Sequence, residues 1–271
     1  FLAAAGLTAA ALALTACGGS SSSTASSTAS SAAASSEAAS SSAAAELTTV
    51  EAGKLTMATN AAFPPYEMTT DTGAFEGIDV DTAQAIAEKL GLELQIDDMD
   101  FDAALLSVQQ GKADIVMAGV TVTDERKAVM DFSDSYATGI QSIIVPEGSD
   151  IATPDDLAGK KIGTQRGTTG YIYCSDDFGD ENVVAYDDGL TAVQALNNGQ
   201  VDAVVIDNAP AKEFVAANPG LVILDTSYAE EDYAIGMAKG SALEDAINAA
   251  LEELKADGTL QSIVDKYITA E

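Results

Sequence analysis

The residues best suited to chemistry follow a short apolar run, residues 113–118, which is typical of a buried strand. Gly119, Thr121 and Arg126 come next, and Arg126 is one of only two arginines in the chain. A guanidinium donates two parallel hydrogen bonds to a carboxylate, a glycine lets a ligand approach the backbone, and a hydroxyl donates or accepts. We interpret this stretch as half of a site for a small carboxylate. The alternative is that Thr123 caps a short helix and Arg126 pairs with a surface acid.

A second segment has the same layout. Residues 104–119 and 192–207 each show a helical apolar pattern, then a glycine, then an aspartate three residues later, then a buried strand. The first segment ends at Gly119 and the second at Asp207. Because ligands in open α/β sheets bind beyond the carboxyl ends of strands, two similar lobes that face one another are expected.

A stretch of glycines and threonines follows the strand expected at 160–164. Gln165, Thr168 and Thr169 lie in it, and a helix is expected to open at Tyr171. Backbone N–H groups at a helix start favour an anion. The stretch matches neither a Walker A loop nor a GxGxxG pattern, so nucleotide phosphate is not expected. The alternative is a plain turn from strand to helix.

Composition limits the classes of function. The chain has 271 residues, 43 acidic and 12 basic, with a net charge of −31, which argues against nucleic acid as a partner. It has no histidine, which excludes Ser-His-Asp and Cys-His catalysis and any His-ligated metal. The acidic run 97–102 suggests calcium but lacks the glycine and the final glutamate of an EF-hand loop. No metal and no cofactor are therefore expected, and the role of Cys174 stays open.

The N-terminal part has the character of an export signal. Residues 1–16 are small and apolar, as in part of a signal peptide, and Leu14-Thr15-Ala16-Cys17 resembles the bacterial lipobox, in which the cysteine is lipidated. Residues 17–46 are rich in Ser and Ala and are expected to form a disordered tether. The alternative is an ordinary exported protein that is cleaved nearby. We expect a protein anchored by lipid at Cys17 to the outer face of the cell membrane.

The globular part alternates between strand and helix patterns, which favours an α/β fold in which each lobe is a mixed, mostly parallel sheet with helices on both faces. A loop between the first strand and the first helix carries Phe63, two prolines and Tyr66. A capped turn with proline in its first position is expected at 153–157. Strands are expected at 54–59, 92–96, 113–118, 141–146, 160–164, 221–224 and 233–238, and helices at 81–90 (capped by Asp81), 103–110, 124–130, 241–256 and 258–267.

From about residue 55 to residue 267 the chain resembles the polar amino-acid-binding proteins of ABC importers, the extracellular solute-binding family 3, and in particular its glutamine- and basic-amino-acid-binding members. The resemblance is carried by Ala62-Phe-Pro-Pro-Tyr-Glu67, Gly77-Ile-Asp-Val-Asp81, Gly111-Lys-Ala-Asp114, the run from Ala118 to Asp134, and Gly167-Thr-Thr-Gly170. It implies a two-lobed periplasmic-binding-protein-like fold (type II) with two hinge crossovers, near 137–141 and 227–233. Lobe 1 would then be 48–137 plus 233–271, and lobe 2 would be 142–228.

The resemblance also implies roles for residues of the site. Arg126 would bind the α-carboxylate of an amino acid, with the backbone N–H of Thr169. Asp207 would bind the α-ammonium, with the carbonyl of Gly119 and the hydroxyl of Thr121.

The side chain of the ligand would be read by other residues. Phe63 and Phe101 would enclose it, and the positions of Asn60, Gln165 and Ile206 would recognise it. Because these three are uncharged, a neutral side chain is expected, although the neighbouring Arg166 leaves glutamate or aspartate as an alternative.

The sequence thus predicts a monomeric, extracytoplasmic binding protein that is not an enzyme and delivers an L-amino acid to an ABC transporter permease. One alternative is a dehydratase of the prephenate or arogenate class on the same fold, for which Glu67 and Arg166 are the spare ionisable groups. Another is the sensor domain of a receptor, which the expected lipid anchor disfavours.

Overall fold

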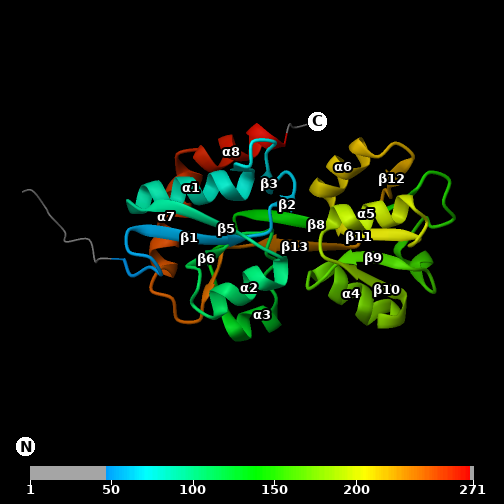
Figure 1. Ribbon diagram of the computed structural model, residues 1–271, viewed down its shortest axis with the longest axis horizontal. Helices are drawn as coiled ribbons and strands as arrows, with labels where there is room; N and C mark the ends of the chain where they lie inside the picture. The colour runs from blue at the N-terminus through cyan, green and yellow to red at the C-terminus, as the bar shows by residue number, and fades with distance from the viewer. Residues whose placement is uncertain (1–46, 269–271) are drawn as a thin grey trace, which may run out of the picture. The chain divides into compact units, whose positions relative to one another are not determined.

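The structure is a computed structural model, and it describes residues 47–268. The predictions for the signal peptide, for lipidation at Cys17 and for the tether concern residues 1–46 and lie outside the described residues. Two mixed sheets carry the fold, each covered by helices, and together they form the two sheet-rich lobes expected for this class (Figure 1).

The first sheet has the order β5-β1-β6-β14-β7, with β5, β1 and β6 parallel and β14 antiparallel to both of its neighbours. Helices α1, α7 and α8 contact one another above it, and α2 and α3 lie on the other side (Figure 1). These elements are β1 Lys54–Thr59, α1 Ile78–Leu90, β5 Glu93–Asp98, α2 Phe101–Gln109, β6 Ile115–Val116, α3 Asp124–Val129, β7 Met130–Phe132, β14 Gly236–Ala238, α7 Glu244–Ala256 and α8 Thr259–Tyr267.

The second sheet has the order β10-β9-β11-β8-β12, and β13 also pairs with β8. Strands β10, β9 and β11 are parallel, whereas β8 is antiparallel to β11, β12 and β13. Helices α5 and α6 lie on one side and α4 on the other (Figure 1). The bounds are β8 Ala137–Pro146, β9 Ile162–Gln165, α4 Thr169–Phe178, β10 Val183–Tyr186, α5 Gly189–Asn197, β11 Ala203–Asp207, α6 Asn208–Ala217, β12 Leu221–Ile223 and β13 Ala229–Tyr233, with 3-10 turns η1 Pro154–Leu157 and η2 Asp180–Asn182.

Successive residues of the buried strands face opposite sides of each sheet, as the period of a strand requires. In β1, Met57 packs in the cluster that contains the α1 side chains, and Ala58 packs with Phe101 of α2. In β11, Val204 packs in the cluster of α5 and α6, and Val205 packs with Cys174 of α4. The core therefore has a layer on each face of both sheets. Cys174 is part of this core, and its burial raises the pKa of its thiol to about 12.

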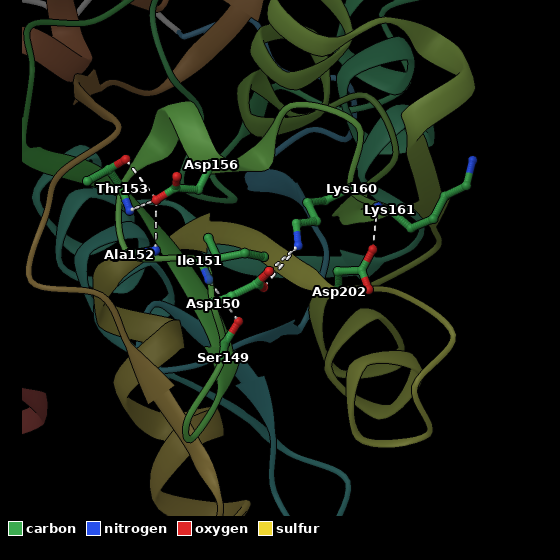
Figure 2. Close-up of polar contacts among 9 residues, drawn as sticks. All are labelled: Ser149, Asp150, Ile151, Ala152, Thr153, Asp156, Lys160, Lys161 and Asp202. Atoms are coloured by element: carbon green, nitrogen blue, oxygen red, sulfur yellow. Dashed lines mark hydrogen bonds and ion pairs between the residues drawn. The ribbon is translucent and has the colours of Figure 1, made fainter.

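The aspartates of the two repeated segments, Asp114 and Asp202, make equivalent hydrogen bonds in the two sheets. Asp114 accepts hydrogen bonds from the backbone N–H of Thr56 (2.8 Å) and of Val50 (2.7 Å). Asp202 accepts one from the N–H of Lys161 (2.7 Å), next to strand β9 (Figure 2). Each aspartate thus ties the start of its own strand to the start of the neighbouring parallel strand.

The capped turn expected at 153–157 is confirmed. Pro154 opens the 3-10 helix η1, and the Asp156 carboxylate accepts hydrogen bonds from the N–H groups of Ala152 (3.0 Å) and Thr153 (2.9 Å) and from the Thr153 hydroxyl (3.0 Å) (Figure 2). These bonds satisfy backbone donors that a helix start leaves without intrahelical partners.

Several expected elements are wrong in their bounds, and the strand expected at 113–118 is reduced to β6 Ile115–Val116. Helix α1 begins at Ile78 rather than behind a cap at Asp81, because the carbonyl of the N-cap residue Gly77 already accepts a helical hydrogen bond from the N–H of Asp81 (2.9 Å). Asp81 instead accepts hydrogen bonds from Lys266 (2.7 Å) and Tyr267 (3.0 Å).

The strand expected at 233–238 is two strands, β13 in the second sheet and β14 in the first, because the chain changes sheets between them. The hairpin-like sheet of β2 Ala62–Phe63, β3 Glu67–Thr69 and β4 Phe75–Glu76 was not expected from the sequence.

Candidate functional site

All ten residues predicted to bind a ligand line one pocket. They come from the ends of β1, β9 and β11, from β2, from the starts of α2 and α4, from the segment between β6 and α3, and from α3 itself. This is the carboxyl edge of the parallel strands, where open α/β sheets bind ligands. These residues are Asn60, Phe63, Phe101, Gly119, Thr121, Arg126, Gln165, Thr168, Thr169 and Asp207.

Arg126 is buried, with 8% of its surface exposed, and its position is fixed by the local helix start. The Thr123 side chain accepts a hydrogen bond from the backbone N–H of Arg126 (3.2 Å), so the expected cap is present. The Arg126 guanidinium donates to the carbonyls of Thr121 (2.8 Å) and Gly167 (3.2 Å) and lies 5.4 Å from the centre of the Phe101 ring. Burial lowers the pKa of Arg126, but a guanidinium stays charged in proteins. A buried cation that is hydrogen-bonded to neutral carbonyls is suited to an anionic ligand.

Asp207 supplies the opposite charge at the end of β11. Gln141 donates to its Oδ2 (2.8 Å), whereas its buried Oδ1 has no hydrogen-bond partner among residues 47–268. Burial raises the pKa of Asp207 to about 7, and the nearby Glu231 carboxylate acts in the same direction. An acceptor in this state is suited to a cationic donor such as an ammonium group.

A polar network that sequence reasoning missed joins the two charged residues. Glu231 of β13 accepts hydrogen bonds from the Thr121 hydroxyl (3.0 Å) and from the Gln141 amide (3.0 Å). Gln141 is directly opposite Asp207 in the pairing of β8 with β11. No local signal in the sequence marks Gln141 or Glu231, because the pairing of β8 with β11 and β13 brings them to the pocket. The missed lining residues are Ala118, Gln141 and Val205, together with Glu67, which the sequence had singled out only as a spare acid.

The uncharged end of the pocket is formed by two amides. Gln165 donates to the Asn60 carbonyl oxygen (2.8 Å) and to the backbone carbonyl of Asp187 (3.2 Å), and Asn60 donates to the carbonyl of Met99 (3.0 Å). Ile206 also lines the pocket. Arg166 does not line it, because its exposed guanidinium forms an ion pair with Asp187 (3.5 Å).

The start of α4 completes the pocket. The Thr168 hydroxyl donates to the Gln165 carbonyl (2.8 Å) and accepts from the N–H of Tyr171 (3.3 Å), so it caps the helix. Thr169 is the first helical residue, is buried, and has its hydroxyl 3.5 Å from that of Thr121. Thr168 therefore caps the helix at the N–H of Tyr171, and the backbone N–H groups at the start of α4 remain suited to an anion.

Neither a metal centre nor a membrane span is found in the described part of the chain. No group of three His, Cys, Asp or Glu side chains within it could hold a metal ion. In the acidic run 97–102, Asp98 accepts a hydrogen bond from the N–H of Ala61 (2.8 Å) and so shapes the loop next to Asn60. Within residues 47–268 no helix combines the length and apolar character needed to cross a bilayer.

Comparison with known proteins places the chain in a family. Residues 55–270 match the bacterial extracellular solute-binding proteins, family 3. The L-cystine-binding protein TcyJ of Escherichia coli (strain K12) is 33% identical over 226 residues, which cover 82% of this chain and 85% of that protein.

Two solved structures share the fold. The arginine-, lysine-, histidine-binding protein ArtJ from Geobacillus stearothermophilus is 34% identical with a TM-score of 0.77, over 80% of this chain and 96% of that one. An ancestral arginine-binding protein bound to glutamine is 42% identical with a TM-score of 0.77, over 80% and 99%. The expected two-lobed fold is confirmed, and the chain belongs to the bacterial extracellular solute-binding proteins, family 3.

Proposed function

We propose that this chain captures a free L-amino acid in the pocket and delivers it to the permease of an ABC transporter. A single observation carries the proposal. A buried guanidinium, Arg126, and a buried carboxyl, Asp207, line the same pocket, and neither is in an ion pair with another described residue. An amino-acid zwitterion presents one anion and one cation, so it complements both groups at once.

The proposed contacts follow the sequence prediction. Arg126 and the N–H of Thr169 bind the α-carboxylate, and Asp207, the Gly119 carbonyl and the Thr121 hydroxyl bind the α-ammonium. Charge-assisted hydrogen bonds contribute about 1.5–3 kcal/mol each, so two or three of them, together with burial of the ligand against Phe63 and Phe101, are consistent with micromolar or tighter affinity.

A neutral side chain is proposed for the ligand because the far end of the pocket is uncharged. Asn60 and Gln165 are hydrogen-bonded to each other there, Ile206 is apolar, and Phe63 and Phe101 are buried beside the space. Among the relatives, a protein named for arginine has been found bound to glutamine, so arginine in a relative's name does not exclude a neutral ligand. Known relatives are binding proteins, and the dehydratase alternative has no support.

We further propose lobe 1 as 48–137 plus 233–271 and lobe 2 as 142–228, which close around the ligand as a monomer. The expected crossovers correspond to parts of the paired strands β8 and β13. The family is extracellular by description, and lipidation at Cys17 would hold the protein at the outer face of the cell membrane.

Calorimetry on two variants tests the assignment. Arg126→Ala and Asp207→Ala are each expected to weaken binding by at least about tenfold, the equivalent of one lost charge-assisted bond, with an unchanged circular dichroism spectrum. Glu252→Ala, at an exposed position of α7 away from the pocket, is the control and keeps full affinity. Unchanged affinity in either charge variant contradicts the proposal. A thermal-shift screen of the twenty amino acids, cystine and ornithine identifies the ligand, and a preference for arginine over glutamine contradicts the neutral side chain.

A further inference from the structure

Glu67 is a fully buried acid beside the pocket that the proposed contacts do not use. It is the first residue of β3, has 0% of its surface exposed, and contributes to the pocket lining. No backbone amide, hydroxyl or amine of the described residues donates a hydrogen bond to either carboxylate oxygen. Because an unpaired buried carboxylate is costly, this group needs a proton or an unusual partner.

The polar neighbour of Glu67 is the carboxyl group of Asp79 in the first turn of α1, which is also fully buried. Two carboxyl groups can form a hydrogen bond only when one of them carries a proton. Asp79 already accepts from the N–H of Gly119 (3.0 Å) and from the hydroxyl of Tyr136 (2.7 Å), one donor at each oxygen. The negative charge is therefore best satisfied on Asp79, and the proton belongs on Glu67.

The surrounding charges support this distribution. Burial raises the pKa of Glu67 well above its ordinary value, and the acidic groups of Asp79, Asp207 and Asp98 act in the same direction. Burial also raises the pKa of Asp79, to about 6, while the Tyr136 hydroxyl and the Gly119 amide oppose the rise. At neutral pH the pair then holds one proton and one negative charge.

The pair is connected to the binding geometry through Gly119. This glycine has φ +55°, and a Cβ there would lie 2.9 Å from the Phe63 ring and 3.3 Å from Tyr233, so its backbone sits directly against the aromatic wall. Its N–H is held by Asp79. We propose that Glu67 and Asp79 form a proton-sharing carboxyl pair that positions Gly119 and Phe63 for the ligand. The inference rests on the proposed function, because Gly119 is assigned there to the α-ammonium.

Two substitutions distinguish the role of the Glu67 proton from that of the Glu67 side chain. Glu67→Gln supplies a neutral amide that donates to Asp79 as the protonated acid does, so affinity near neutral pH is expected to stay within about threefold of the wild type. Glu67→Ala removes the donor and is expected to cost at least about tenfold. In the wild type, affinity falls at alkaline pH as Glu67 ionises and displaces Asp79. The affinity of Glu67→Gln is not expected to fall in this way. Any loss of affinity caused by deprotonation of the ligand's own amino group is expected in both the variant and the wild type. Glu252→Ala serves again as the unaffected control.

Carbon NMR of the Glu67 carboxyl in the ligand-free protein tests the proton without any binding. A protonated carboxyl at neutral pH supports the pair, and a carboxyl that titrates in the ordinary range of glutamate overturns it. A Glu67→Gln variant that loses as much affinity as Glu67→Ala also overturns it. If the wild type binds no amino acid, the proposed function fails, but the NMR titration still decides whether Glu67 carries a proton. The NMR titration also decides this point if Glu67→Ala does not fold.

Discussion

Asp207 shows how one side chain can be adjusted for a cationic ligand. It lies at the end of a buried strand, keeps one oxygen without a hydrogen-bond partner in the described structure, and has a pKa raised by burial to about 7. A carboxyl in this state is partly protonated near neutral pH. An ammonium group prefers the ionised form, so the proposed contact with Asp207 predicts that ligand and proton compete for this carboxylate.

This competition predicts an affinity that rises with pH. Between about pH 5 and pH 8 the wild type is expected to bind its amino acid more tightly as Asp207 loses its proton, and binding near neutral pH should release a fraction of a proton. Calorimetry in buffers of different ionisation enthalpy measures both quantities. Asp207→Asn, which cannot ionise, should bind weakly and without this rise. An equal rise in the asparagine variant would contradict the assignment.

The charged and aromatic members of the pocket could be predicted from the sequence because each lies next to a recognisable strand end or helix start. Gln141 and Glu231 could not, since they reach Asp207 and Thr121 only through the register of β8 with β11 and β13. Glu67 was visible as an acid, but its burial against Asp79 depends on the packing of β3 on α1. Local pattern specifies what a strand end presents, whereas pairing across strands decides what supports it.

Strand β8 contacts the pocket residue Asp207 and also pairs with β13. Its residue Gly139 pairs with Glu231 of β13, and a Cβ at Gly139 would lie 2.5 Å from the Tyr233 hydroxyl and 2.6 Å from Asp207 Oδ1. The two antiparallel strands therefore leave no room for a side chain at this point. The sequence predicts a crossover here, and the packing adds that it is part of a paired strand with a glycine where no side chain fits.

Gly139→Ala is expected to disturb both stability and binding. The added methyl must displace Tyr233 or Asp207, and overpacking of this kind typically costs about 1–3 kcal/mol. Thermal or urea unfolding measures the loss of stability, and calorimetry should show weaker binding because Asp207 moves. Thr138→Ala in the same strand faces solvent and should change stability by less than about 0.5 kcal/mol. Equal stabilities for the two variants would contradict the tight packing.

Across the whole described part, hydrogen bonds join the elements of the two sheets around the pocket. Gln165 donates to Asn60, and Arg126 donates to the carbonyl of Gly167. The pocket wall is therefore continuous, and the buried acids Glu67, Asp79 and Asp207 lie within or behind it. Their shared environment makes the ionisation of the site a property of the folded chain as a whole.

These three acids predict that the ligand-free protein loses stability as pH rises. The pKa of each is raised by burial, from 3.8 to about 6 for Asp79, from 3.8 to about 7 for Asp207, and well above 4.5 for Glu67. Above about pH 4 the unfolded chain has released these protons while the folded chain still holds them, so the stabilising contribution decreases through this window.

Thermal unfolding should therefore give a higher Tm near pH 5 than near pH 8, although the net charge of −31 adds repulsion in the same direction. Glu67→Gln and Asp207→Asn separate the two causes, because each removes one buried titration and should flatten the slope while the surface charge stays almost unchanged. Saturating ligand should flatten it as well, since a bound ammonium favours ionised Asp207. If both variants keep the wild-type slope, the pH dependence arises from surface charge and the buried acids do not control it.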